Sequence, residues 1–304
     1  MSIDALIAAL PVPPNVLGES PLWHPQEQVL YWVDIPGRHL QRYDPSSGAY
    51  QEWAFDADLG CCAATTAGDL LLTRRDGLVR FDPKSGRSTP LAPAPYDPAF
   101  ERFNDGKVDP QGRFWVGTIY EPRDAPRAAL YRLAGATLQR QAGDITVSNG
   151  LAWSPDGRLA YWADTKAHVV YRMDCDPQTG RLGPRELFLR FEPKDEAAPA
   201  LYGGRPDGAA VDAEGCYWVA MFEGARLLRF SPEGELLRTV PLPVRCPTMP
   251  CFGGADLRTL YLTTAREKRP ATELEAMPWS GRVLQLRVDV PGLPATLAQL
   301  DPLP

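Results

Sequence analysis

One pattern recurs six times along this chain of 304 residues: a polar turn followed by an aromatic or β-branched segment. Successive copies are separated by 41, 44, 45, 58 and 41 residues. The six turn positions are Glu27, Gly68, Gly112, Gly157, Gly215 and Asp256. A blade of four strands takes about 40–50 residues, so this interval predicts a β-propeller. An ordinary β-sandwich also has frequent turns, but it does not account for a repeat of this length.

A second segment follows each turn and alternates apolar with polar residues, as a half-buried strand does before a hairpin. We therefore expect an all-β fold: a six-bladed β-propeller with four-stranded antiparallel blades around a central channel, forming a single domain over residues 1–304. Two stretches, 191–206 and 266–281, depart from the repeat and are expected to be loops on the binding face. We expect residues 3–10 to pair with the last blade and close the ring.

Polar residues recur at one position of the repeat, eight residues before each turn. The six residues are Glu19, Gly60, Asn104, Asn149, Asp207 and Thr248. Each starts the innermost strand of its blade, so all six should ring one end of the channel. Four of them carry carboxylate or carboxamide oxygens, which are the ligands of a hard cation. Pairs such as Asn149-Gly150 and Asp207-Gly208 are also ordinary turn signals, but their shared register favours a common site.

We therefore predict one divalent cation at the mouth of the channel. Two carboxylates brought close together would repel each other, and a dication removes that penalty. An oxygen-only ligand set admits calcium, magnesium, manganese, zinc or ferrous iron.

Charge and composition exclude several classes of partner. The net charge is −6, which argues against a nucleic-acid partner because nucleic-acid-binding surfaces are basic. The sequence has no apolar run near the roughly 18 residues that a membrane-spanning helix needs, and its start does not resemble a signal peptide. The six cysteines show no C-x-x-C spacing. We expect a cytoplasmic protein that is a monomer or weak oligomer.

Five segments resemble the regucalcin (senescence marker protein)/gluconolactonase family of propeller lactonases. They are GESPLWHPQEQVLYWVDI, RFNDGKVDPQGRFWVGTIYE, SNGLAWSPDGRLAYWADT, PDGAAVDAEGCYWVAM and CFGGADLRTLYLTTAR, and they extend from Gly18 to Arg266 in the family's order. The resemblance implies that Glu19, Asn149 and Asp207 bind the metal and that Asp207 is also the general base. It further implies that Arg102, Asn104 and Glu121 bind the substrate.

The expected function is metal-dependent hydrolysis of a sugar lactone, such as glucono- or xylonolactone, to the aldonic acid. Other catalytic groups are weak candidates: the chain has only three histidines, all at turns or strand starts, and no G-x-S-x-G motif. Cys61 and Cys62 are expected to be buried, inert thiols. Two alternatives stay open: a calcium-binding regulatory or scaffold propeller without turnover, and a related propeller esterase or phosphoesterase.

Overall fold

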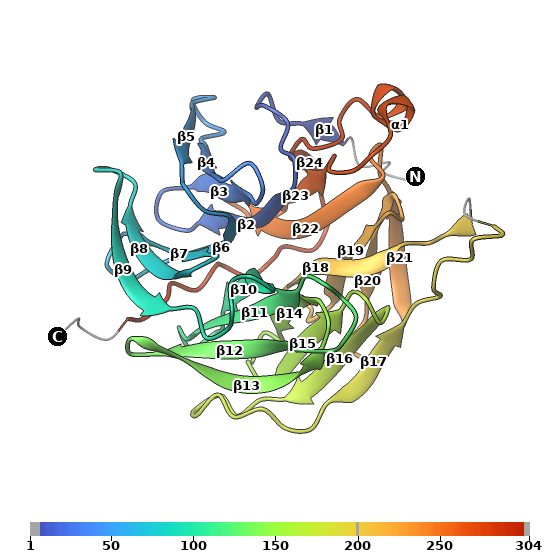
Figure 1. Cartoon of the computed structure of the whole chain (residues 1–304). Helices are drawn as coiled ribbons and strands as arrows, with labels where there is room; N and C mark the ends of the chain where they lie inside the picture. The colour runs from blue at the N-terminus through green and yellow to red at the C-terminus, as the bar shows by residue number, and fades with distance from the viewer. Residues whose placement is uncertain (1–6, 199–200, 301–304) are drawn as a thin grey trace.

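The computed structural model describes residues 7–198 and 201–300, which form six four-stranded antiparallel sheets around a central axis (Figure 1). The first strands of consecutive blades contact one another in a closed circuit, from β2 through β6, β10, β14, β18 and β22 back to β2. This arrangement confirms the six-bladed β-propeller that the repeat predicts.

The first five blades use their strands in sequence order, from the channel outward. Blade 1 contains β2 (Gly18–His24), β3 (Val29–Asp34), β4 (His39–Tyr43) and β5 (Tyr50–Ala54). Blade 2 contains β6 (Leu59–Ala64), β7 (Leu70–Arg74), β8 (Gly77–Asp82) and β9 (Arg87–Pro93). Blade 3 contains β10 (Glu101–Val108), β11 (Phe114–Tyr120), β12 (Ala128–Ala134) and β13 (Thr137–Ile145). Blade 4 contains β14 (Ser148–Trp153), β15 (Leu159–Asp164), β16 (Val169–Asp174) and β17 (Glu186–Arg190). Blade 5 contains β18 (Arg205–Val211), β19 (Tyr217–Phe222), β20 (Arg226–Phe230) and β21 (Leu236–Pro241).

Blade 6 is assembled from both halves of the chain. It contains β22 (Cys246–Gly253), β23 (Thr259–Ala265) and β24 (Leu284–Arg287), and its outermost strand is β1 (Ala8–Ala9). Ala8 pairs with Gln285 and Ala9 with Leu284. The predicted pairing of the N-terminal stretch with the last blade is therefore correct for Ala8 and Ala9, while residues 3–6 lie outside the described part of the chain.

Each blade interface has its own hydrophobic core. The six buried clusters lie between consecutive blades, and the cluster between blades 6 and 1 closes the series. Four tryptophans of the second strands are fully buried in these cores: Trp32, Trp115, Trp162 and Trp218. The buried apolar side chains lie between the blades. The fold therefore does not need an apolar lining at the mouth of the channel, and polar groups can lie there.

The repeat turns depend on one glycine and one buried polar cap. Gly112 and Gly215 have φ values of 87° and 81°, in the left-handed region that glycine adopts without steric cost. Asp109 lies three residues before Gly112, and it accepts hydrogen bonds from the backbone N–H groups of Gln111 and Arg113, both at 3.0 Å. It also accepts the indole N–H of Trp115 at 2.9 Å. The cap thus fixes the turn and anchors the tryptophan of the next strand.

Every innermost strand loses register with its neighbour at the same place. The breaks lie between Glu19 and Leu22, Leu59 and Cys62, Phe103 and Gly106, Asn149 and Ala152, Pro206 and Ala209, and Pro247 and Pro250. A β-bulge inserts an extra residue, interrupts the side-chain alternation and re-aims the side chains beside it. The six bulges coincide with the positions eight residues before each turn.

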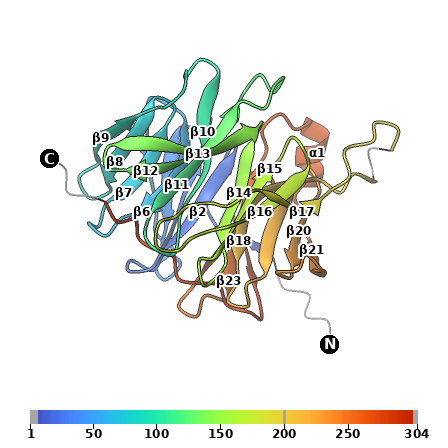
Figure 2. The ribbon, with the colours of Figure 1, turned by 90° about the horizontal axis from the view of Figure 1, so that it is seen from below.

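The chain continues past β24 as a strap, residues 288–300, which crosses the channel on the face that carries the repeat turns (Figure 1). Gly292 donates its N–H to Leu257 O of blade 6 at 2.8 Å, and Ala298 donates to Ala64 O of blade 2 at 2.8 Å. The strap then reaches blade 3, where Gln299 donates to Gly112 O at 2.8 Å. In Figure 2 the strap follows the lower face of the ring. The sequence pattern does not predict this element.

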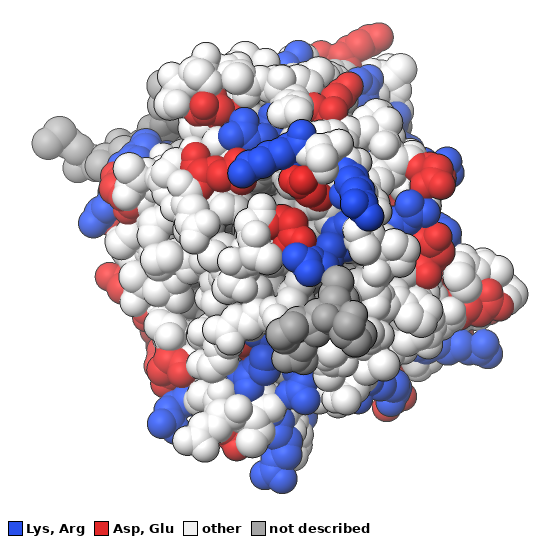
Figure 3. All heavy atoms as spheres, turned by 90° about the vertical axis from the view of Figure 1, so that its left-hand side faces the viewer, with Lys and Arg blue, Asp and Glu red and all other residues white. Residues whose placement is uncertain are grey.

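The two non-repeating stretches lie where inner strands begin, as expected for loops at the mouth. Residues 191–198 and 201–204 precede β18, and the stretch 266–281 includes α1 (Ala271–Ala276) between β23 and β24. Within residues 7–198 and 201–300, no helix is long and apolar enough to cross a membrane. Acidic and basic side chains are interspersed on the face in Figure 3, without a continuous patch of one sign.

Candidate metal and substrate site

Four polar residues of the six-residue ring lie buried at the mouth of the channel. Glu19 of β2, Asn104 of β10, Asn149 of β14 and Asp207 of β18 are each at most 7% exposed. Their common position follows from the bulges, because each residue lies at the register break of its inner strand. Four blades therefore contribute one oxygen-bearing side chain each.

The other two ring positions have packing roles. Gly60 allows close approach of blade 3, because a Cβ atom added there would lie 2.7 Å from Phe103 O. Thr248 donates its hydroxyl to Gly18 O at 2.6 Å, with Thr263 Oγ1 at 2.8 Å. These contacts join blade 2 to blade 3 and blade 6 to blade 1.

A chain of hydrogen bonds links the site residues across three blades. Arg102 Nη1 donates to Asn104 Oδ1 at 2.7 Å, and Asn104 Nδ2 donates to Asn149 Oδ1 at 2.8 Å. Asn149 Nδ2 in turn donates to Thr165 Oγ1 at 2.8 Å. The Thr165 hydroxyl completes the chain by donating to Pro206 O at 2.7 Å, immediately before Asp207. The structure thus brings Arg102, Asn104 and Asn149 together, and Thr165 is a member that the repeat does not reveal.

Three buried carboxylates share this end of the channel. Burial raises the pKa of Glu19 well above its usual value, and the charges of Asp207 and Asp105 raise it further. Burial likewise raises the pKa of Asp207 to about 8. Asp105 has a pKa of about 6 because it is buried, although the charge of Lys107 opposes that shift. These three carboxylates repel one another when they are ionised, so a cation bound among them would stabilise their ionised forms.

Asp105 is the acid that the repeat position misses. Phe103 and Gly106 pair with Thr118 and Val116, so Asn104 and Asp105 both occupy the bulge. Asp105 Oδ2 accepts the N–H of Leu151 at 2.8 Å, whereas Oδ1 has no hydrogen-bond partner among the described residues. In a regular strand, consecutive side chains point to opposite faces of the sheet. The bulge interrupts this alternation, so the repeat position alone does not identify Asp105.

The side-chain oxygens of Glu19, Asn149 and Asp207 are of the kinds that bind a hard divalent cation. Two of these groups are carboxylates that burial drives toward protonation, and a cation in contact with them restores the ionised form. Asn149 Oδ1 already accepts one hydrogen bond, and a carbonyl oxygen has a second lone pair for a metal.

The substrate-binding candidates form the rim beside the carboxylates. Arg102 is 11% exposed, and its Nε lies 3.6 Å from Glu121 Oε1. Arg75 donates to both oxygens of Glu121, at 2.8 and 3.1 Å. The same guanidinium donates to Asp58 Oδ2 at 2.8 Å. Burial raises the pKa of Glu121, but the hydrogen bond from Arg75 and the charges of Arg75 and Arg102 outweigh it and keep that pKa below its usual value. Arg75 is a rim residue that the sequence analysis does not identify.

A second acidic group, Asp212 with Glu214 and Cys216, belongs to a turn. The side chain of Asp212 is fully buried, and its Oδ1 accepts the N–H groups of Glu214 and Cys216 at 3.0 Å. Its Oδ2 accepts Trp218 Nε1 and Arg229 Nε, both at 2.8 Å. This is the capping arrangement of Asp109, and it leaves the carboxylate occupied.

The remaining candidates for catalysis have structural environments. His24 Nδ1 accepts the N–H of Glu27 in the first repeat turn at 3.1 Å, and His168 Nε2 lies 2.7 Å from the Tyr202 hydroxyl. The six cysteines are free thiols. Burial raises the pKa of Cys61 well above its usual value and that of Cys62 to about 12, as expected for inert thiols.

Comparisons with known proteins agree with this architecture. Residues 17–266 match the family described as SMP-30/Gluconolactonase/LRE-like region. The chain is 47% identical over 280 residues to a 6-deoxy-6-sulfogluconolactonase of Pseudomonas putida, covering 92% of this chain and 94% of that protein. It is 35% identical over 286 residues to the regucalcin of Gallus gallus, covering 91% and 93%.

A solved structure of regucalcin from Agrobacterium tumefaciens, described as a calcium-binding protein, superposes with a TM-score of 0.89. The two chains are 28% identical, and the match covers 96% of this chain and 97% of that one. The family match spans most of the chain, in agreement with the resemblance in its motifs. The chain therefore belongs to the SMP-30/gluconolactonase/LRE-like family.

Proposed function

We propose that this protein is a metal-dependent lactonase that hydrolyses a sugar lactone to the corresponding aldonic acid. The observation that carries the proposal is that Glu19, Asn149 and Asp207 are buried at the bulges of three inner strands. Asn149 is hydrogen-bonded to Asn104 and through it to Arg102, whose Nε lies 3.6 Å from Glu121 Oε1. The similarity to a sulfogluconolactonase over 92% of the chain supports the same activity.

Glu19, Asn149 and Asp207 would hold one divalent cation. When bound, the cation polarises the lactone carbonyl and stabilises the negative charge that develops on its oxygen. Calcium is the first candidate, because the ligand set is all oxygen and the regucalcin neighbour is described as calcium-binding. Magnesium, manganese, zinc and ferrous iron are the alternatives for the same ligands.

Asp207 would take the proton of the attacking water at a carboxylate oxygen. A carboxylate has two oxygens and about four lone-pair sites, so metal binding through one oxygen leaves another acceptor for water. A dication lowers the basicity of a carboxylate that it holds, whereas burial raises the pKa of Asp207, so the two effects act in opposite directions.

Arg102, Asn104 and Glu121 would orient the hydroxyl groups of the sugar. Arg102 offers only donors, whereas the carboxylate of Glu121 offers acceptors, so the rim suits a ring that both donates and accepts hydrogen bonds. Positioning of this kind lowers the barrier without new bonds to the reacting atoms. The rim suits gluconolactone and xylonolactone as substrates. The name of the 47% identical relative adds 6-deoxy-6-sulfogluconolactone as a third candidate.

The test is lactone hydrolysis with and without chelator, with spontaneous opening subtracted. We expect turnover of at least one aldonolactone, loss of turnover in chelator, and recovery when one of the five metals is restored. Stoichiometric metal binding without turnover of any lactone or phosphoester would favour a calcium-binding regulatory or scaffold protein instead. Turnover of phosphoesters alone would favour the phosphoesterase alternative.

We further propose that the protein acts in the cytoplasm as a monomer or weak oligomer, without a nucleic-acid or membrane partner. Its six free thiols suit a reducing compartment, and its net charge of −6 does not favour anionic polymers.

A further inference from the structure

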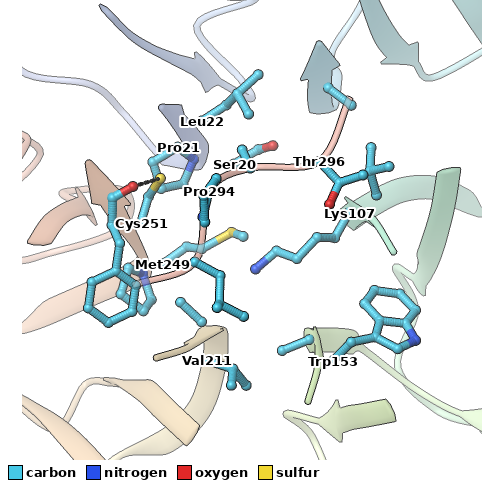
Figure 4. A pocket seen from close by; sticks show the side chains of 18 of the residues that line it. Ser20, Pro21, Leu22, Lys107, Trp153, Val211, Met249, Cys251, Pro294 and Thr296 are labelled. Carbon is cyan, nitrogen blue, oxygen red and sulfur yellow. Dashed lines mark hydrogen bonds between the residues drawn. The ribbon is translucent and has the colours of Figure 1, made fainter. Parts of the chain in front are cut away.

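On the strap side of the six-residue ring, the channel contains a cavity of about 450 Å³, the lower cavity (Figure 4). All six inner strands contribute to its wall, and residues 293–296 of the strap lie across it. Most lining side chains are apolar, among them Leu22, Trp153, Val211, Met249, Phe252 and Leu293. A volume of this size is in the range of small-molecule sites, which are about 300–1,000 Å³.

Lys107 is the one acidic or basic residue in this lining. It lies on β10, and in Figure 4 its side chain extends into the cavity. Its Nζ donates to Ala209 O at 2.6 Å, the one hydrogen bond that this ammonium makes with the described residues. An ammonium has three N–H donors, so two are available to a ligand. A charged group in apolar surroundings is costly unless it is paired, and a ligand can supply that pairing.

Asp105 is the carboxylate whose charge acts on Lys107, and it is not among the residues that line the cavity. Burial lowers the pKa of the Lys107 ammonium, and the charge of Asp105 opposes that shift. The Asp105 carboxylate is itself bonded to Leu151 N, and its charge also acts on Glu19 and Asp207 above it. Among the described residues, the Lys107 ammonium donates no hydrogen bond to Asp105, so it remains open toward the cavity.

We infer that this lower cavity is a binding site for a small monocarboxylate with an apolar body, separate from the metal and substrate site. The carboxylate would accept charge-assisted hydrogen bonds from Lys107, and the apolar body would cover the aliphatic and aromatic wall. A sugar lactone does not suit this cavity, because most of its hydroxyl groups would have no partner there. The inference does not depend on the lactonase activity.

The probe is octanoate, measured by isothermal titration calorimetry on the full chain with metal present. We expect one octanoate per chain, bound at least about tenfold more tightly than octan-1-ol, since charged hydrogen bonds are the stronger ones. Lys107→Met keeps a long apolar side chain and removes the ammonium, so it should reduce octanoate affinity to the level of octanol. Lys84→Met, at an exposed turn lysine, is the matched control and should bind like the wild type.

A second variant tests the location without touching Lys107. Ala295 belongs to the strap and lines the cavity, and Ala295→Trp should fill it and abolish binding of both octanoate and octanol. Lactone hydrolysis and the melting temperature report whether each variant is folded. Equal affinity for octanoate and octanol, no binding of either, or unchanged octanoate binding in Lys107→Met or Ala295→Trp would each overturn the inference.

Discussion

Arg75 of blade 2 holds both carboxylate oxygens of Glu121 of blade 3, with Nη1 at 2.8 Å from Oε2 and Nη2 at 3.1 Å from Oε1. Asp58 holds the same guanidinium from the other side. As long as this contact persists, Glu121 presents its oxygens to a substrate in a single orientation. The rim of the site is shaped by a residue that need not touch the substrate.

Arg75→Met should raise KM for the aldonolactone by about tenfold and change kcat less, because it releases Glu121 without removing it. Steady-state kinetics on the metal-loaded enzyme measure both constants. Arg75→Lys retains the charge but cannot make the two-pronged contact, so it should fall between the wild type and the methionine variant. Equal loss of kcat and kcat/KM, with KM unchanged, would contradict a positioning role.

Glu19→Gln, Asn149→Ala and Asp207→Asn should each weaken metal binding strongly, because each removes a ligand oxygen or its charge. Metal content after dialysis, by elemental analysis, is the measurement. Glu214→Gln is the control. Glu214 lies in the turn that Asp212 caps, outside the six-residue ring, so this variant should retain the metal. Stoichiometric metal in all three ring variants would show that the ring is not the metal site.

Arg102→Ala should keep normal metal occupancy, because a guanidinium cannot be a ligand. KM should rise, and kcat should fall if the sugar is less well positioned. The same dialysis and kinetic assays test both statements. Loss of metal from a variant whose circular dichroism is unchanged would refute the role assigned to Arg102.

The metal-free protein should lose stability as the pH rises. Burial raises the pKa of Asp207 to about 8 in the folded chain, whereas in the unfolded chain an aspartic acid titrates near about 3.9. Between these values the unfolded state has released a proton that the folded state retains, so unfolding becomes more favourable as the pH increases.

In chelator, the melting temperature of the wild type should therefore fall by several degrees more between pH 5 and pH 8 than that of Asp207→Asn, which cannot ionise there. Saturating metal should remove most of the difference, because the cation favours the ionised carboxylate. Identical pH slopes for the two proteins in chelator would rule out a raised pKa at Asp207.

Aldonolactones should be hydrolysed far faster than an unsubstituted lactone of equal ring size. An apolar ring would displace water from Arg102, Asn104 and Glu121 without replacing its hydrogen bonds, at about 1–3 kcal/mol for each polar group so desolvated. Comparing kcat/KM for gluconolactone and δ-valerolactone, after subtraction of spontaneous opening, tests this. Equal values would reject the sugar as substrate and leave the metal site untouched.

The repeat predicts the blades because each blade repeats the same local requirements. Gly112 and Gly215 mark left-handed turns, and the strands that follow are aromatic, so both signals are contained within a few residues. The register of the ring is predictable for the same reason. The position eight residues before each turn identifies Glu19, Asn104, Asn149 and Asp207, since the bulge recurs in every inner strand.

The parts that escape prediction depend on contacts between distant segments. Arg75 and Glu121 come from different blades, and nothing near either residue encodes their pairing. Asp105 is missed because the bulge places it beside Asn104, contrary to simple alternation. The strap has no repeat pattern at all, and its course is fixed by backbone hydrogen bonds such as that between Ala298 and Ala64.

The outermost strand of blade 6 has a consequence for the order of events during protein synthesis. Ala8 leaves the ribosome early, but its partner, Gln285, is 277 residues further along the chain (285 − 8). Blades 1 to 5 can form while translation continues, whereas the junction between blades 6 and 1 must wait until nearly the whole chain has emerged. During that interval the nascent protein is an open arc with two unprotected ends, and the docking of blade 6 on blade 1, with the pairing of β1 and β24, converts it into a ring.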